Sequence, residues 1–297
     1  MATVIQVIPT GAHAGAEIRG IDLREEVSAA AFLQVENALH EHGVIFFRGQ
    51  RVSPVQQERF SRRFGELETP VLEQYTVPGF PNVLILSNVL QDGRPVGLVD
   101  AGRFWHSDST YRPAPARCSL LHAIEVPTDD AGRPLGDTLF IRTDLAYDRL
   151  SPEVRERLQG LRARHSFSHP YEKHYDKPAS EGGGQRDKLT DEQRQRTPES
   201  IHPVVRTHPF TGRKCVYVNE GLTAGFVGME ELEGEALLQQ LCTLCTPEDM
   251  VYRHRWQVGD VLIWDNCMTQ HRATGGYEWP RHRRYIHRTT SKGSVPF

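Results

Sequence analysis

The chain breaks into short apolar runs bounded by glycine, proline, asparagine and aspartate, and this pattern limits the fold more than any other feature. Runs with the length and residue types of strands occupy 43–47, 82–86, 118–126, 137–141, 202–207, 214–218, 250–256, 260–264 and 283–290. Apolar residues recur three and four positions apart in 28–42, 54–64, 152–158 and 229–245, which predicts helices there. We therefore expect a mainly β protein, a sandwich or barrel, with flanking helices.

Size and charge narrow the class of protein further. A chain of 297 residues is within reach of a single all-β domain, and we find no internal repeat or linker, so we expect one domain over 1–297. The formal charge of -3 and the absence of a long basic run argue against a nucleic-acid or membrane partner. We expect a small-molecule substrate instead.

The termini and the cysteines bear on localisation. The N-terminal residues show no basic segment followed by an apolar one, so we expect a cytoplasmic protein. The 5 cysteines have no framework-like spacing, which fits a reducing compartment. Cys242 and Cys245 form a CxxC within a helical pattern. Because no second pair completes a metal site, we interpret them as two small apolar residues of a helix.

The segment 171–200 differs in composition from the rest of the chain. It is polar, rich in glycine and nearly without apolar side chains, which predicts a mobile loop. Within it, Thr190 and Gln193 have the spacing of a capping box and predict a short helix. The loop is either a lid over a site or a surface insertion, and composition does not separate these two interpretations.

A possible metal site is formed by residues far apart in the sequence. In the run FWHSDSTY, a strand would place His106 and Asp108 on the same face. His271 follows a strongly apolar strand more than 150 residues downstream. Two imidazoles and one carboxylate on one side of a metal leave coordination positions open, an arrangement typical of non-haem Fe(II) oxygenases.

Two arginines of the last strand add a second signal. Alternation along RRYIHRTT places Arg284, Ile286 and Arg288 on one face. Two buried guanidinium groups are costly unless each meets an anion. That anion is either a carboxylate of the protein or an anionic ligand. Beside the three candidate metal ligands, we favour a dicarboxylate co-substrate, because planar arginine matches carboxylate geometry.

The order of motifs resembles the taurine/2,4-D dioxygenase family (TauD/TfdA type) of 2-oxoglutarate-dependent oxygenases, and the resemblance covers nearly the whole chain. It rests on GAEIRGIDLRE (15–25), GVIFFRGQ (43–50), SRRFGEL (61–67), WHSDSTY (105–111), GDTLF (136–140), HPVVRTHPFTGRKCVYVNEG (202–221), WDN (264–266) followed by His271, and RRYIHRTT (283–290). The resemblance implies a double-stranded β-helix, or jelly-roll, core.

The resemblance also implies the cofactors. It places Fe(II) on His106, Asp108 and His271, and it assigns Thr138 and Arg284 to the distal carboxylate of 2-oxoglutarate. The implied reaction consumes O2, hydroxylates a small acidic organic substrate, and releases succinate and CO2. Desaturation or cleavage of a bond between carbon and a heteroatom are the alternative outcomes. We further expect a homo-oligomer, either a dimer or a tetramer.

Substrate residues follow less directly from the resemblance. Arg288 matches the position that meets the acidic group of the substrate, while Asn219, Leu222 and Tyr171 would line the pocket. Taurine is disfavoured, because ETPVLEQY (68–75) stands where taurine enzymes carry a histidine and a tyrosine. Leu222 likewise replaces an aromatic residue.

Two other classes of protein remain open on the same residues. A zinc hydrolase would use the same three ligands, but it leaves Arg284 and the GDT motif without a role. A non-catalytic binding protein on a jelly-roll scaffold leaves the full set of motifs without an explanation.

Overall fold

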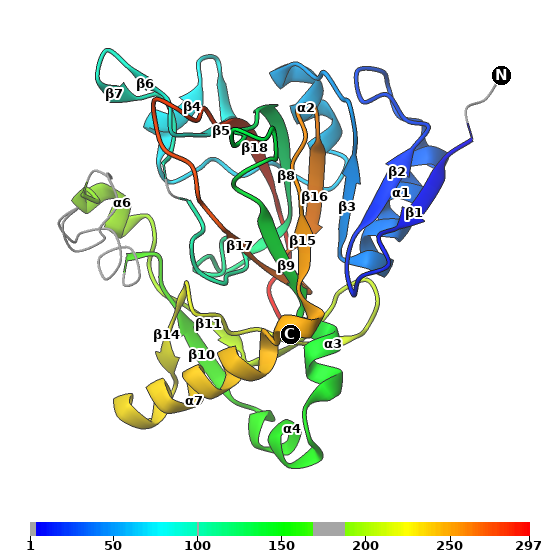
Figure 1. Cartoon of the computed structure of the whole chain (residues 1–297). Helices are drawn as coiled ribbons and strands as arrows, with labels where there is room; N and C mark the ends of the chain where they lie inside the picture. Colours follow the sequence, from blue (N-terminus) through cyan, green and yellow to red (C-terminus); the bar gives the residue numbers. More distant parts are fainter. Residues whose placement is uncertain (1–3, 100, 169–187) are drawn as a thin grey trace.

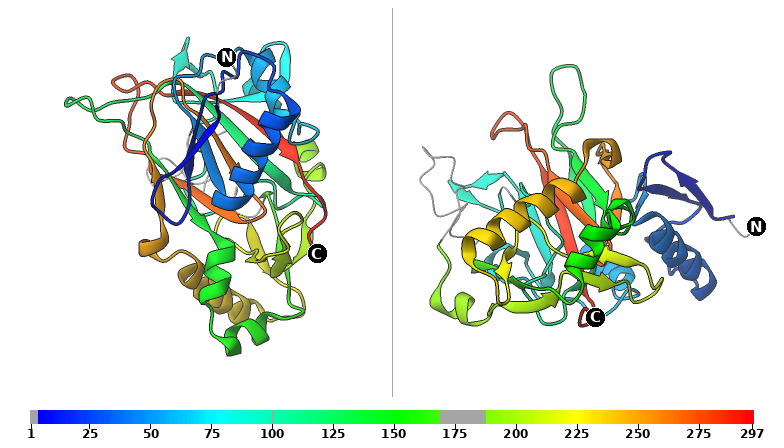
Figure 2. Two further views of the ribbon diagram at one scale, coloured as in Figure 1. Left: turned by 90° about the vertical axis from the view of Figure 1, so that its right-hand side faces the viewer. Right: turned by 90° about the horizontal axis from the view of Figure 1, so that it is seen from below.

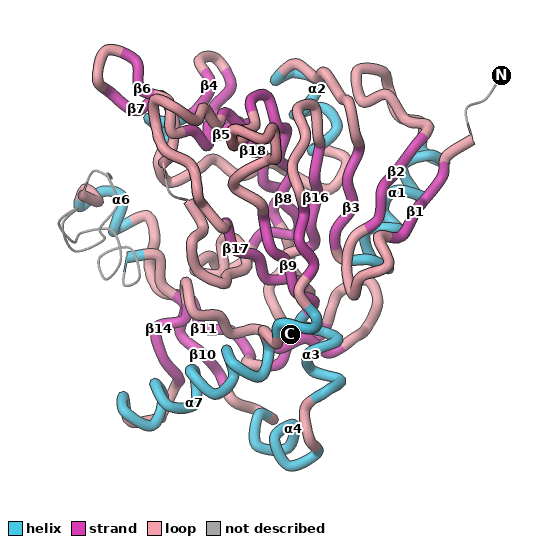
Figure 3. The backbone as a smooth tube through the Cα atoms, viewed as in Figure 1, coloured by secondary structure: helices cyan, strands magenta, loops and turns pink. Residues whose placement is uncertain are grey.

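Two β-sheets pack against each other in the computed structural model, which describes residues 4–99, 101–168 and 188–297 (Figures 1 and 3). The larger sheet consists, in spatial order, of β1 (Gln6–Pro9), β2 (Ala16–Arg19), β3 (Val44–Phe47), β16 (Val261–Asp265), β8 (Ala116–Glu125), β18 (Tyr285–Lys292), β5 (Phe80–Ser87) and β4 (Thr76–Val77). The smaller sheet consists of β15 (Tyr252–His254), β9 (Thr138–Arg142) and β17 (Thr269–Ala273). All pairings in these two sheets are antiparallel except that of β2 with β3.

The remaining strands form smaller ribbons around these sheets: β11 (Ser200–Pro203) with β10 (Arg162–His165) and β14 (Thr223–Phe226), β12 (Val205–Thr207) with β13 (Lys214–Val216), and β6 (Leu90–Gln91) with β7 (Arg94–Pro95). The helices are α1 (Ala29–His42), α2 (Pro54–Ser61), α3 (Thr143–Arg149), α4 (Pro152–Leu158), α6 (Asp191–Gln195) and α7 (Glu231–Cys245), with 3-10 turns at Glu73–Tyr75 and Glu248–Met250. Figure 2 shows α3, α4 and α7 gathered at one end of the molecule.

The pleat of the larger sheet divides its apolar residues between two cores. On β16, Val261 and Ile263 point to the face covered by α1 and α2. Leu262 and Trp264 point to the opposite face, where they meet Phe140 of the smaller sheet. A strand that is apolar on both faces is expected to lie in the centre of the fold, and β16 does so.

Helix ends follow local sequence signals. The Ser28 side chain accepts a hydrogen bond from the amide of Ala31 at the start of α1, and Gly43 ends that helix with a φ of 71°. The predicted capping box of Thr190 and Gln193 is confirmed at the start of α6. Of the loop predicted over 171–200, only residues 188–200 belong to the described part of the chain. The lid interpretation therefore stays a prediction.

Most predicted elements are present, including strands in every predicted run and helices in every predicted helical segment. Cys242 and Cys245 are free thiols on α7, as expected for residues of a helix. No strand was predicted at β17, which carries His271. In the described parts of the chain, no helix has both the length and the apolar character needed to cross a membrane.

Candidate active site

His106 and His271 face each other across a single antiparallel bridge. The amide of His106 donates to the carbonyl of His271 over 3.1 Å, and the amide of His271 donates back over 2.8 Å. The prediction that 104–111 forms a strand is wrong beyond this bridge, because the chain enters a turn at Asp108. The turn bends the backbone round, and Asp108 still reaches both histidines.

The donor atoms of these three side chains are close enough to share one ion. Nε2 of His106 lies 3.6 Å from Oδ1 of Asp108, and Nε2 of His271 lies 3.9 Å from the same oxygen. One donor atom from each of the three residues lies within 4.8 Å of the others. A small inward shift of the three side chains would bring each donor atom to about 2.1 Å from a metal ion placed between them.

The ionisation states of the site also suit a metal. Burial lowers the pKa of His106 and lowers that of His271 well below its ordinary value, so both imidazoles are neutral at neutral pH. Burial alone would raise the pKa of Asp108, but the ion pair with Arg288 and the hydrogen bond from Ser119 hold it at about 2. Two neutral imidazoles and one carboxylate are the ligand states that a divalent cation requires.

Neighbouring side chains fix the Asp108 carboxylate. The hydroxyl of Ser119 on β8 donates to Oδ2 over 2.6 Å, while Oδ1, which Arg288 also contacts, faces the two histidines. Asn266 donates from its amide to Ser119 over 3.1 Å and accepts the backbone amide of Asp108 over 3.0 Å. Trp264 donates to the same Asn266 oxygen over 2.9 Å. Thus the WDN motif of the sequence anchors the carboxylate through Asn266.

The two histidines are held differently. Nδ1 of His106 lies 2.8 Å from the carbonyl of Phe104, which fixes the tautomer with the free lone pair on Nε2. The ring of His271 packs against Trp264 and Phe140, with centroid separations of 4.5 and 5.9 Å. Packing sets the orientation of His271, whereas a hydrogen bond sets that of His106.

Arg288 lies on β18 and Arg284 directly precedes that strand; the two arginines alternate with buried Ile286 as predicted, but their partners differ. Arg288 makes an ion pair of 2.9 Å with Oδ1 of Asp108, so for this residue the protein itself supplies an anion. Arg284 is 6% exposed, and within the described residues no carboxylate lies at ion-pair distance from it; Asp137, whose charge acts on it, pairs with Arg253 instead. Burial lowers its pKa.

The surroundings of Arg284 bring in the GDT motif. Its Nη1 donates to the carbonyl of Gly136 over 2.9 Å, and a Cβ at Gly136 would lie 2.8 Å from that nitrogen. The guanidinium also lies over the rings of Tyr277 and Trp256. The indole of Trp256 donates to Thr138 over 3.0 Å. Arg284 and Thr138 therefore border the same buried region, and among the described residues no carboxylate forms an ion pair with this guanidinium.

Comparison with known proteins agrees with this geometry. The family model described as taurine catabolism dioxygenase TauD, TfdA family, matches residues 6–290. The chain belongs to the TauD/TfdA family.

Members of known activity and structure support the same assignment. The alpha-ketoglutarate-dependent 2,4-dichlorophenoxyacetate dioxygenase of Cupriavidus pinatubonensis is 35% identical over 269 residues, covering 87% of this chain and 88% of that protein. Pentalenolactone F synthase of Streptomyces arenae is 31% identical, covering 95% and 93%. A crystal structure of AAD-2 with Mn(II) and N-oxalylglycine is 29% identical, with a TM-score of 0.79 over 99% of this chain and 98% of that one. The protein is thus a dioxygenase dependent on alpha-ketoglutarate, which is 2-oxoglutarate.

The predicted substrate residues of this TauD/TfdA enzyme have separate positions. Asn219 is buried, and its side-chain oxygen accepts the amide of Leu222 over 2.8 Å, so it shapes the loop that precedes β14. Leu222 is half-buried on that loop. Tyr171 lies outside the described residues. For Asn219 the visible role is therefore structural, and contact with substrate stays a prediction.

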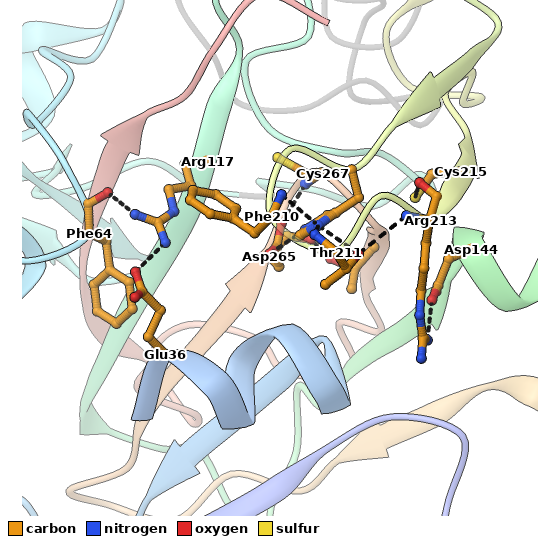
Figure 4. A network of polar contacts seen from close by, with 12 residues as sticks. Glu36, Phe64, Arg117, Asp144, Phe210, Thr211, Arg213, Cys215, Asp265 and Cys267 are labelled. Carbon is orange, nitrogen blue, oxygen red and sulfur yellow. Dashed lines mark hydrogen bonds and ion pairs between the residues drawn. The ribbon is translucent and has the colours of Figure 1, made fainter. Parts of the chain in front are cut away.

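A second group of possible ligands, His208, Asp265 and Cys267, forms a hydrogen-bond network, of which Figure 4 labels Asp265, Cys267 and the neighbouring Thr211. Nε2 of His208 donates to Asp265 over 3.0 Å, and its Nδ1 lies 2.9 Å from the hydroxyl of Thr211. The other Asp265 oxygen accepts the amide of Cys267 over 2.8 Å. Although burial opposes it, the bond from His208 lowers the pKa of Asp265. With both imidazole nitrogens occupied, this group braces the end of β16.

Several supporting residues were missed by the sequence reasoning. Ser119 and Asn266 hold the carboxylate, as described above. His202, to which no role was assigned, reaches the carbonyls of Thr110 and Arg112 in the turn after Asp108, over 2.9 and 3.1 Å. The WDN motif was a signal for Asn266, but nothing in the local sequence connects His202 with a turn 90 residues earlier.

Proposed function

We propose that the protein is an Fe(II)- and 2-oxoglutarate-dependent oxygenase that hydroxylates a small organic acid and releases succinate and CO2. His106, Asp108 and His271 would hold the iron. The two packed sheets would form the double-stranded β-helix core of the family. When bound, Fe(II) with 2-oxoglutarate supplies the oxidative chemistry that activates O2.

Arg284 is the observation that carries the proposal. Its buried guanidinium has a carbonyl and two rings as neighbours, and the described residues offer it no carboxylate at ion-pair distance. A buried cation of this kind is costly until an anion reaches it. The distal carboxylate of 2-oxoglutarate is such an anion, with Thr138 beside it as a second contact. A zinc hydrolase on the same three ligands would leave this cation unpaired.

The prime substrate is proposed to be an anion with an apolar body. Arg288 lies at one wall of a cavity of about 110 Å³ whose apolar lining includes Leu72, Leu84, Leu98 and Phe167. At about 110 Å³ this cavity is smaller than the roughly 150 Å³ cavity that binds benzene, so an aromatic ring would have to displace part of the lining. A carboxylate on Arg288 would place the apolar part of a small acid, such as a phenoxyacetate, against this lining. Taurine, which has no such group, fits the cavity less well.

A substrate panel tests the assignment. The metal-loaded protein is given 2-oxoglutarate and O2, and succinate formation is measured with phenoxyacetate, with taurine and without a prime substrate. We expect phenoxyacetate or a related apolar acid to stimulate succinate formation well above the rate seen with taurine. If taurine is the better stimulant, the proposed substrate class is wrong, although the oxygenase assignment stands.

Arg288→Gln is the matched variant in this assay. It removes the charge but keeps a polar side chain, so the KM for the prime substrate should rise by at least tenfold, since hydrogen bonds to charged groups contribute about 1.5–3 kcal/mol. Arg272→Gln serves as the control, because Arg272 lies on β17 and its guanidinium packs over the ring of Trp105. Unchanged KM in Arg288→Gln would remove this residue from the substrate site.

A further inference from the structure

The residue that follows Asp108 has a backbone conformation that ordinary side chains avoid. Ser109 has a φ of 56°, and among the described residues Asp92 is the only other non-glycine residue with positive φ. Left-handed backbone geometry is unfavourable for residues with a Cβ and persists when surrounding contacts enforce it. Because Ser109 is adjacent to Asp108, its conformation sets the direction in which the chain leaves the proposed metal ligand.

Glu68 contacts the side chain of Ser109 directly. The hydroxyl of Ser109 donates to Oε2 of Glu68 over 2.8 Å, and both residues are buried. The same oxygen lies 3.4 Å from Nε of Arg112, whose amide donates to the carbonyl of Ser109 over 2.9 Å. One carboxylate oxygen therefore binds both ends of the turn 109–112.

Glu68 is itself anchored to β18, the strand that carries Arg288. Its amide donates to the carbonyl of Thr290 on β18 over 2.8 Å, and its carbonyl accepts from Asn82 over 3.1 Å. Thr290 also accepts the Nε of Arg288 through its hydroxyl, over 3.2 Å. Glu68 thus links the turn after Asp108 to the strand of the proposed substrate-binding arginine.

We propose that Glu68 is a positioning residue for the metal site, which holds Ser109 in the left-handed conformation and thereby directs the Asp108 carboxylate. The inference rests on the proposed function, because it takes Asp108 as a metal ligand. The competing interpretation is that Glu68 only neutralises Arg112 and contributes to general stability. The two interpretations differ in what a glycine at position 109 would do.

Co(II) binding to the metal-free protein tests the proposal without turnover, by calorimetry and by the visible spectrum of the bound ion. We expect Glu68→Ala to weaken Co(II) binding about tenfold, within the range typical of residues that support metal ligands, and to alter the spectrum. Ser109→Ala, which keeps the Cβ but loses the hydroxyl, should give the same loss. Glu68→Gln, which retains an acceptor oxygen, should restore most of the affinity.

The decisive variant combines Glu68→Ala with Ser109→Gly. Glycine adopts the left-handed conformation without help, so the double variant should bind Co(II) within about threefold of Ser109→Gly alone, well inside the tenfold loss expected of a missing support. If Glu68→Ala weakens binding as much in the glycine background as in the serine background, the proposed route through Ser109 is wrong. An unchanged affinity in Glu68→Ala would also overturn it, as would a change confined to the KM of the prime substrate.

Two controls keep these outcomes separate. Glu66→Ala removes a neighbouring exposed carboxylate that pairs with Lys292, and it should leave Co(II) binding unchanged. Thermal unfolding of each metal-free variant shows whether a loss of affinity follows from a loss of folding. If the wild-type protein fails to bind Co(II), the proposed function fails. If the wild type binds Co(II) and the Glu68 variants bind it equally well, this inference fails alone.

Discussion

At the scale of the residue, Arg284 is the side chain whose surroundings most require a ligand. Its pKa is lowered by burial, and the described residues place no carboxylate at ion-pair distance. Removing one member of a buried charged pair costs about 2–5 kcal/mol of binding free energy. We therefore predict that Arg284→Ala weakens 2-oxoglutarate binding at least about thirtyfold, measured by calorimetry on Mn(II)-loaded protein.

The neighbouring Arg283 provides a control for that variant. It is exposed and pairs with Glu125 at 2.7 Å. Arg283→Ala should leave the affinity for 2-oxoglutarate unchanged. Equal affinities in wild type and Arg284→Ala would show that this arginine does not hold the co-substrate.

His287 leads to a prediction about pH and stability. It lies on β18 opposite His122, and burial, with the neighbouring imidazole, lowers its pKa to about 4. The unfolded chain, with an ordinary pKa near 6.5, binds the proton more readily. The neutral His287 ring therefore makes its full contribution to the free energy of unfolding above about pH 6.5. That contribution is lost as the pH falls toward 4.

His287→Leu removes this titration. Between pH 6.5 and 4.5, urea unfolding of the wild type should lose about 1–2 kcal/mol more stability than the variant does, after allowance for partial exposure. The comparison of slopes is the measurement, because both proteins also share other titrating groups. Parallel slopes would mean that His287 is not held in its neutral form by the fold.

At the scale of the element, the glycine between α1 and β3 is closely packed. Gly43 has a φ of 71°, and a Cβ there would lie 3.0 Å from Thr269, at the start of the strand that carries His271. Gly49 has a similar φ of 64°, but a Cβ there would meet nothing within 4 Å. The two glycines therefore share the backbone requirement and differ in the available space.

Alanine at each glycine separates these two effects. Gly49→Ala should lower the free energy of unfolding by about 1 kcal/mol, the cost of left-handed geometry alone. Gly43→Ala should lower it by about 2–3 kcal/mol, because overpacking is added. Chemical denaturation measures both. Equal losses would contradict the steric contribution assigned to Thr269.

Elements were predicted well where one strand or helix carries its own signal. Alternation correctly grouped Arg288 on β18 with Arg284 just before it, and the capping box of Thr190 and Gln193 predicted α6. The strand predicted around Asp108 was wrong, because contacts from distant parts of the chain impose a turn there. Local alternation carries no information about Glu68 or His202, which bind that turn from other elements.

At the scale of the whole molecule, the order of motifs predicted the family and the grouping of His106, Asp108 and His271, which the structure brings together. The order of motifs along the chain does not show how the two sheets are aligned against each other. The ion pair between Arg288 and Asp108 was therefore not predicted. The homo-oligomer stays a prediction that light scattering on the purified protein would test.

The central claim is that the three ligands and Arg284 form one site for iron and 2-oxoglutarate. The most direct measurement is the visible absorption of metal-free protein after anaerobic addition of Fe(II) and then 2-oxoglutarate. We predict a weak charge-transfer band that requires both additions and is absent in Asp108→Ala. Folded wild-type protein that gives no band with both additions would contradict the account.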